Sequence, residues 1–311
     1  MIISASRRSD IPAFYSEWFF NRLKEGFVLV RNPRNSKQIS HISLAKDVVD
    51  GFVFWTKNPF PMMNRLEELA DYPFYVQFSL NPYGKEVEVN VPSKNDILIP
   101  TFQKLSNMLG KERAMWRYDP ILFNKKYTLD YHIEYFRRLA ETLSTYTNTC
   151  TISFLDLYKS TTTNGKSLGF IPETEEQVHI LMESFSKTAK NTGISLQSCA
   201  EEMDLSQYNV PHGQCIDLKK IEKITGYPLN IAQDKNQRPF CACTSSIDIG
   251  MYDSCNHGCL YCYANSSQNA VVYNMRHHNP KSPLLFGTVQ SDDVVKEREV
   301  FSCRDEQMRL Y

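Results

Sequence analysis

The sequence predicts an α/β fold of the TIM-like (β/α) barrel type. Short runs of β-branched and aromatic residues alternate along the chain with segments of helical periodicity, and we count eight such runs. Alternating strands and helices imply parallel pairing with right-handed crossovers. The chain has neither a glycine-rich dinucleotide fingerprint nor a Walker A sequence. This argues against a nucleotide-binding doubly wound sheet.

The predicted strands and two of the helices between them can be placed from local signals. In chain order, the strands are residues 2–6, 27–31, 51–56, 74–80, 113–118, 150–155, 194–199 and 245–250. One helix begins at Thr174, where a Thr-Glu-Glu-Gln capping box precedes apolar residues at helical spacing, and it ends at Gly193. Another begins at Thr128 and carries Phe136 and Leu139 on one apolar face.

We expect a single barrel over residues 1–270, including the cysteine-rich loop, and a C-terminal extension over residues 271–311 packed on it. Lys and Arg together number 35, as do Asp and Glu, so no overall charge attracts nucleic acid. The chain shows no export signal and no apolar run long enough for a membrane helix. We therefore expect a cytoplasmic protein whose nine cysteines stay reduced and act as metal or redox ligands.

Polar side chains gather where the predicted strands end, which is where parallel barrels place their active sites. Polar groups at such positions cost free energy unless they are paired or face a ligand. We therefore expect an active-site mouth, although salt bridges and helix caps also explain individual residues. The predicted catalytic residues are Arg7, Asp10, Lys57, Arg117 and Asp119, and the predicted cofactor-binding residues are Arg8, Ser9, Gln77 and Tyr261.

Three cysteines lie within the eight-residue stretch CNHGCLYC. Cys255, Cys259 and Cys262 have the spacing C-x₃-C-x₂-C. On one tight loop, three thiolates can each reach a different iron of a [4Fe-4S] cluster, which leaves the fourth iron open to another ligand. Zinc is one alternative, because His257 adds a fourth possible ligand within the same loop. A redox-active loop without metal is the other.

This loop resembles the cluster loop of radical S-adenosylmethionine (SAM) enzymes, which has the motif C-x₃-C-x-aromatic-C. The resemblance implies that SAM chelates the open iron. It also implies that an electron from the cluster cleaves SAM to a 5′-deoxyadenosyl radical, with an electron donor such as a ferredoxin or flavodoxin. The motif is near the C-terminus here, whereas most members carry it near the N-terminus. The Gly-Gly-Glu type contact to the SAM amine is also not found.

A circular permutation of the radical SAM barrel would explain the position of the motif. Residues 245–250 would then be the strand that leads into the cysteine loop, and residues 2–6 would pair beside it. On this arrangement Arg7, Arg8, Ser9 and Asp10 lie near the cluster and are candidates to hold the SAM carboxylate.

Over nearly its whole length the chain also resembles a bacterial family described as domain of unknown function 1848. The segments that carry this resemblance are ISASRRSDIPAFYSEWF, VFWTKNP, WRYDP, SCAEEMDL and CACTSSIDIGMYDSCNHGCLYCYAN. The cysteine cluster of that family is itself compared with the radical SAM loop. The resemblance therefore supports the fold but implies no substrate.

A second set of cysteines comes from three separate segments. Cys241 and Cys243 precede the last predicted strand, Cys199 ends another strand, and Cys215 follows in a polar connection. Four thiols can bind a second [4Fe-4S] cluster with no open iron, or a zinc ion. Buried cysteines without metal are the third alternative.

These features favour a radical SAM-like enzyme acting on a small-molecule or peptide substrate. One alternative is a non-catalytic iron–sulfur or zinc protein with a redox or sensor role. Another is a nucleotide or nucleic-acid repair enzyme of the radical SAM type, although zero net charge makes nucleic acid an unexpected partner.

Overall fold

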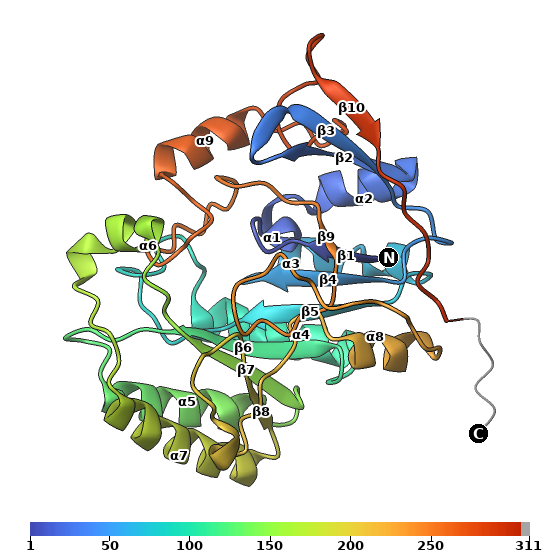
Figure 1. Ribbon diagram of the computed structural model, residues 1–311. Coiled ribbons are helices and arrows are strands. Elements are labelled where there is room, and N and C mark those ends of the chain that lie inside the picture. The colour runs from blue at the N-terminus through green and yellow to red at the C-terminus, as the bar shows by residue number, and fades with distance from the viewer. Residues whose placement is uncertain (306–311) are drawn as a thin grey trace.

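A computed structural model of the protein describes residues 1–305, apart from the side chains of residues 159 and 160. It shows an α/β fold in which helices flank a central sheet of seven parallel strands (Figure 1). The strand order across the sheet is β8-β7-β6-β5-β4-β1-β9. The strands are β1 (Ile2–Ala5), β4 (Gly51–Thr56), β5 (Phe74–Ser79), β6 (Ala114–Ile121), β7 (Thr149–Phe154), β8 (Ser195–Ser198) and β9 (Ile247–Asp248).

The sheet is open, so the closed eight-stranded barrel is not observed. Within residues 1–305 no ladder joins β8 to β9. The predicted strand at residues 27–31 instead forms β2 (Phe27–Asn32) of a separate three-stranded sheet, with β3 (Asn35–Ser43) and β10 (Val294–Glu297). Only two residues separate β2 from β3, which fits an antiparallel hairpin, whereas a parallel crossover needs about a dozen residues.

One face of the central sheet is covered by the connection between β8 and β9. Ile2, Val53, Tyr75 and Met115 point to this face from four neighbouring strands and pack with Ile216 of the connection. The polar connection seen in the sequence therefore returns across the sheet. Its helix α8 (Leu218–Thr225) packs there through an apolar stripe.

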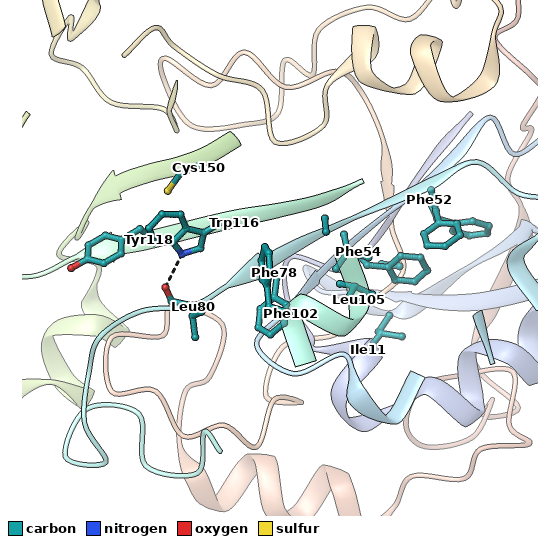
Figure 2. Close-up of a cluster of buried hydrophobic side chains, with 14 of the residues drawn as sticks. Ile11, Phe52, Phe54, Phe78, Leu80, Phe102, Leu105, Trp116, Tyr118 and Cys150 are labelled. Atoms are coloured by element: carbon teal, nitrogen blue, oxygen red, sulfur yellow. Dashed lines mark hydrogen bonds between the residues drawn. The ribbon is translucent and has the colours of Figure 1, made fainter. Parts of the chain in front are cut away.

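The opposite face of the sheet carries the main hydrophobic core. Figure 2 shows aromatic side chains from neighbouring strands packed in a row, including Phe54, Phe78 and Trp116. The Trp116 indole N–H donates to the Leu80 carbonyl oxygen at 3.0 Å, so its one polar atom is satisfied inside the core (Figure 2). Phe102 of helix α4 (Ile99–Leu109) packs against Phe78 with 5.1 Å between ring centroids.

The helices follow the signals in the sequence. Helix α7 (Glu175–Thr192) has the predicted capping box at Thr174 and ends at Gly193, which has a positive φ of 70°. Thr128 caps helix α5 (Leu129–Leu143), and α5 packs on α7. The remaining helices are α1 (Ile11–Phe14), α2 (Ser16–Glu25), α3 (Phe60–Met63), α6 (Lys159–Asn164) and α9 (Gln268–Arg276), with short helical turns at Leu66–Leu69, Lys94–Leu98, Lys166–Leu168 and Ser206–Tyr208.

The strand before the cysteine loop lies where the sequence places it. β9 pairs in parallel with β1, with Ile247 opposite Ile3 and Asp248 opposite Ser4. The last strand of the central sheet in the chain is therefore the neighbour of the first. This pairing brings the loop after β9 next to residues 7–10, as predicted.

The C-terminal segment is connected to the rest of the molecule at several points. Helix α9 spans the predicted boundary at residue 270, and β10 adds a parallel strand to the small sheet (Figure 1). Leu285 and Phe286 join the main core. In residues 1–305, no helix combines the length and apolar character needed to cross a membrane.

Candidate active site

A cavity of about 420 Å³ lies where β1, β4, β6 and β7 end, together with the loops that follow them. Cysteines of both sets and most of the predicted polar residues line it. Those lining it are Arg7, Arg8, Ser9, Asp10, Lys57, Arg117, Asp119, Tyr261, Cys199, Cys215, Cys241, Cys243, Cys255 and Cys259. Of the predicted site residues, Gln77 and Cys262 are outside this lining. The sequence therefore predicted a set of residues that the fold brings together.

Arg8 and Ser9 hold the loop after β9 in place. The Arg8 side chain donates to Asp248 of β9 through Nε at 3.2 Å and Nη2 at 3.1 Å. Ser9 Oγ lies 2.7 Å from Ser254 Oγ and accepts from the Met251 N–H at 2.9 Å. These contacts use most of the polar atoms of both side chains to fix the backbone just before Cys255.

Asp10 joins three elements at the entrance of the three-cysteine loop (residues 255–262). Its Oδ1 accepts from the Ala13 N–H at 3.0 Å and caps α1. Its Oδ2 accepts from the Lys57 N–H at 2.8 Å and lies 2.8 Å from His257 Nε2. In the described part of the chain, His257 Nδ1 is buried without a hydrogen-bond partner. That nitrogen is thus available to a ligand.

Arg7 presents a cation to the cavity. Its guanidinium lies over the Trp55 ring, 5.6 Å from the centroid. Among residues 1–305 its buried Nη2 has no hydrogen-bond partner. A buried donor without a partner costs free energy, so this atom is a suitable contact for an anionic ligand.

Lys57 is paired with an acid that sequence reasoning missed. Glu88 is buried, and its carboxylate binds Lys57 Nζ at 2.8 Å, Lys94 Nζ at 2.7 Å and the Tyr261 hydroxyl. Burial alone would raise the pKa of Glu88, but Lys57 and Lys94 overcome it and lower the pKa to about 2. Burial would lower the pKa of Lys57, but the same pairing raises it, so Lys57 is held as an ammonium ion.

The segment around Glu88 also holds the three-cysteine loop. Glu88 forms a backbone bridge with Cys259, and the Asn90 N–H donates to the His257 carbonyl at 2.9 Å. Nothing in the stretch GKEVEVN marks it as part of a site, because its alternating pattern is typical of an exposed strand.

The three cysteines of the loop are half-buried and lie close to one another. Burial raises the pKa of Cys259 to about 12 against the opposing effect of Lys57. Cys255 and Cys262 are electrostatically coupled to the same thiol. Gly258 turns the loop with a positive φ of 65°, beside Asn90. No contact between the sulfurs of the three cysteines is found in the described residues.

Arg117, Asp119 and Gln77 lie on the other side of the cavity. Arg117 Nε donates to Asp119 Oδ2 at 2.9 Å, and its Nη1 donates to the Gln77 side-chain oxygen at 3.3 Å. Burial would lower the pKa of Arg117, but Asp119 raises it well above its usual value. Gln77 is fully buried and also donates to the Cys215 carbonyl at 2.9 Å, so it positions Arg117 rather than facing a cofactor.

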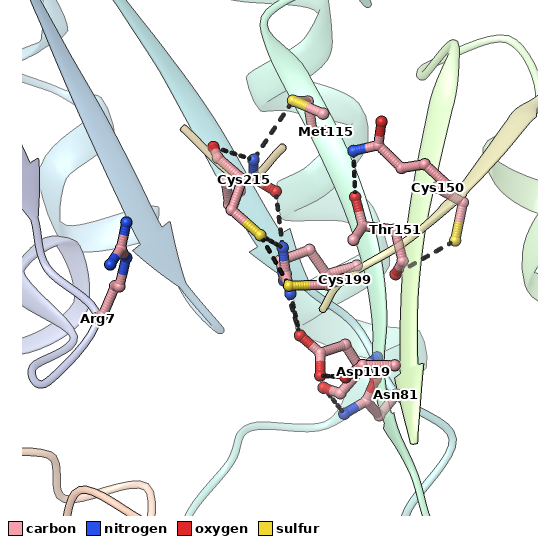
Figure 3. Close-up of polar contacts among 12 residues, drawn as sticks. Arg7, Asn81, Met115, Asp119, Cys150, Thr151, Cys199 and Cys215 are labelled. Atoms are coloured by element: carbon pink, nitrogen blue, oxygen red, sulfur yellow. Dashed lines mark hydrogen bonds and ion pairs between the residues drawn. The ribbon is translucent and has the colours of Figure 1, made fainter. Parts of the chain in front are cut away.

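The four-cysteine group (Cys199, Cys215, Cys241 and Cys243) is brought together from its three segments. Cys199 Sγ lies 3.1 Å from Cys215 Sγ, and Figure 3 shows these two side chains next to each other above Asp119. The Cys243 thiol interacts with those of Cys215 and Cys241. Cys199 and Cys215 are thus in contact, and Cys241 and Cys243 lie in the lining of the same cavity.

The two remaining cysteines, Cys150 and Cys303, belong to neither set. Cys150 is fully buried in the core, and Cys303 lies near the C-terminus. In residues 1–305, no group of three or more His, Cys, Asp or Glu side chains is arranged to hold a single metal ion.

Comparison with known proteins gives a family for the chain. No curated protein matches it. The model of the family described as Domain of unknown function (DUF1848) matches residues 2–264, a span that contains the central sheet, the cavity and both cysteine sets. The chain therefore belongs to this family.

Proposed function

We propose that the protein is an iron–sulfur enzyme of the radical SAM type that acts on a small molecule or a peptide. The observation that carries the proposal is the shared cavity. The three-cysteine loop and the polar ends of several parallel strands converge on one space of about 420 Å³, which suits a small ligand. Since the central sheet is open, we propose further that it is an incomplete, permuted form of the barrel, with β9 as its first strand.

The residues of the loop fit a [4Fe-4S] cluster held by Cys255, Cys259 and Cys262. Ligands to different irons must be spread apart, and no sulfur–sulfur contact within this loop is found in the described residues. His257 Nδ1 adds a buried donor or acceptor without a partner beside the same thiols.

When bound, such a cluster would supply the electron that splits SAM and so initiates hydrogen abstraction from the substrate. The chain's own groups would bind and orient the reactants. The Arg7 guanidinium, with its partnerless buried Nη2, is suited to a carboxylate such as that of SAM. Lys57 remains charged beside Cys259 and offsets the negative charge of a thiolate-ligated cluster.

The test is anaerobic reconstitution with iron and sulfide, followed by electron paramagnetic resonance of the reduced protein with and without SAM. We expect the signal of the reduced cluster to change on adding SAM, and 5′-deoxyadenosine to accumulate in the presence of a reductant. The Cys259→Ala variant should lose both effects, whereas the matched Cys303→Ser variant should keep them.

A cluster that forms but does not respond to SAM would contradict the proposal and support the non-catalytic redox or sensor alternative. Zinc at the three-cysteine loop would do the same. An Arg7→Ala variant that binds SAM as tightly as the wild type would remove Arg7 from the SAM site.

A further inference from the structure

The four-cysteine group joins parts of the chain that are distant in sequence. Cys199 follows β8, Cys215 precedes α8, and Cys241 and Cys243 lie just before β9. The sulfurs of Cys199 and Cys215 are 3.1 Å apart, and all four cysteines line the same cavity. Four cysteines from three segments meeting in one place is the pattern expected for metal ligands in a reducing compartment.

Cationic groups surround these sulfurs. Arg117 Nη1 donates to Cys215 Sγ at 2.9 Å, and Arg238 Nη2 lies 3.9 Å from Cys199 Sγ. Arg117 is buried, with its side chain only 5% exposed. A buried guanidinium that donates to sulfur is suited to a thiolate rather than to a neutral thiol. Arg117 and Arg238 are thus placed to offset the negative charge that metal-bound thiolates would carry.

Backbone groups also point at the sulfurs. The Ile216 N–H donates to Cys243 Sγ at 3.5 Å. Hydrogen bonds from amides and side chains to ligand sulfurs are a common means of tuning thiolate-bound metals. Neither the Arg117 contact nor this one is needed for cysteines that only fill a hydrophobic core.

We propose that Cys199, Cys215, Cys241 and Cys243 together bind a second thiophilic metal centre, separate from that of the three-cysteine loop. With four protein ligands this centre has no position left for a substrate, so it serves to join the three segments or to relay electrons. Zinc and an iron–sulfur cluster share this ligand chemistry. Since no group in residues 1–305 is arranged around a single ion, zinc would have to draw the four sulfurs closer together. The inference does not rest on the proposed function, because it uses neither SAM nor the three-cysteine loop.

The experiment measures iron, zinc and acid-labile sulfide in full-length protein purified without oxygen. The variant Cys255→Ser/Cys259→Ser/Cys262→Ser should retain the second centre, and Cys241→Ser/Cys243→Ser should lose it while keeping the first. In the triple variant, zinc without iron would identify the second centre as a zinc ion. Iron together with sulfide would identify it as an iron–sulfur cluster. Cys150→Ser/Cys303→Ser is the control and should match the wild type.

A Co²⁺ titration of the metal-free triple variant gives a second measurement. We expect thiolate-to-cobalt absorption bands that saturate at one centre per chain. Metal contents that are unchanged in Cys241→Ser/Cys243→Ser would overturn the proposal. Absent cobalt bands would do so where the triple variant also contains neither zinc nor iron with sulfide. If that double variant does not fold, alkylation of the wild type decides: the four cysteines should react only after chelation, and equal labelling before chelation would overturn the proposal.

Discussion

The two cysteine sets of this protein line the same cavity but are built in different ways. The three-cysteine loop is one short segment after β9, and its position depends on contacts with β1 and with the segment around Glu88. The four-cysteine group depends on the long connection that returns across the sheet. One set could be found from its spacing alone, whereas the other exists only after folding. We therefore call the three-cysteine loop the local set, because it is one short segment, and the four-cysteine group the assembled set, because folding brings its segments together.

The cations near the two sets differ as well. Lys57, beside the three-cysteine loop, shares the carboxylate of the buried Glu88 with Lys94. Arg117, beside the four-cysteine group, binds Asp119 and donates directly to a sulfur. A compact ammonium ion on one side and a planar guanidinium on the other suit different tasks, because only the guanidinium holds two acceptors in fixed directions.

The largest effect should follow from loss of the assembled set. If the four-cysteine group binds metal, Cys241→Ser/Cys243→Ser should lower the free energy of unfolding far more than Cys259→Ser/Cys262→Ser. Metal-binding energy becomes folding energy when the ligands are brought together by the fold, and it reaches on the order of 10 kcal/mol in small zinc domains. Denaturant unfolding of both variants, with metal bound, measures the difference. If both variants lost the same free energy of unfolding, metal binding by the four-cysteine group would not contribute more to folding than metal binding by the three-cysteine loop.

Much of this architecture could be predicted from the sequence, and the exceptions have physical causes. The strands of the central sheet and the helix cap at Thr174 follow from local patterns, and the β9–β1 pairing follows from placing the cysteine strand next to the first one. β3 was missed because its first half is polar and exposed, so no buried face marks it. The closed barrel was wrong because residues 27–32 pair with that strand instead.

The site shows the same limit. Arg7, Asp10, Lys57 and Arg117 could be predicted because they lie in the polar stretches at or after the carboxyl-terminal halves of recognisable strands. Glu88 could not, since its role depends on partners that are distant in sequence and on burial that its polar neighbours conceal.

The next effect concerns the cation beside the three-cysteine loop. Glu88→Gln should lower the free energy of unfolding by about 3–5 kcal/mol, because it leaves Lys57 and Lys94 without their buried acid. Chemical denaturation measures the loss. The matched control is Glu86→Gln, whose ion pair with Lys126 is exposed and should contribute about 1 kcal/mol or less. Similar losses in the two variants would show that the buried pair does not support the loop.

A smaller effect is the acid sensitivity that arises from His132, a residue that belongs to neither cysteine set. It gives a reference for acid effects that do not involve the cysteines. His132 is fully buried between the Tyr118 hydroxyl and the Leu122 carbonyl, and burial lowers its pKa from 6.5 to about 4. His132 is therefore protonated more readily in the unfolded chain than in the folded protein. The stability that neutral His132 contributes is fully present above pH 6.5 and is lost as the pH falls towards 4. The loss is about 3 kcal/mol at most.

His132→Gln should remove that part of the acid sensitivity without changing the metal content. Unfolding free energies of the variant and the wild type at pH 7 and pH 4.5 measure it. If the two proteins lose the same stability between these values, the acid response has its origin elsewhere, for example in protonation of metal ligands.

The smallest expected effect is that of removing Arg238, the more exposed of the two cations near the four-cysteine group. It tests whether this cation is required for metal binding. Arg238 binds Asp156 at the rim and donates to the Cys199 carbonyl at 3.0 Å, but its side chain is 33% exposed and that of Asp156 is 48% exposed. Since water screens such a pair, Arg238→Gln should change the free energy of unfolding by about 1 kcal/mol or less. Metal content should stay that of the wild type. A larger loss, accompanied by loss of metal, would mean that Arg238 balances the charge of the sulfurs together with Arg117. The Arg238–Asp156 ion pair would then be part of the four-cysteine site.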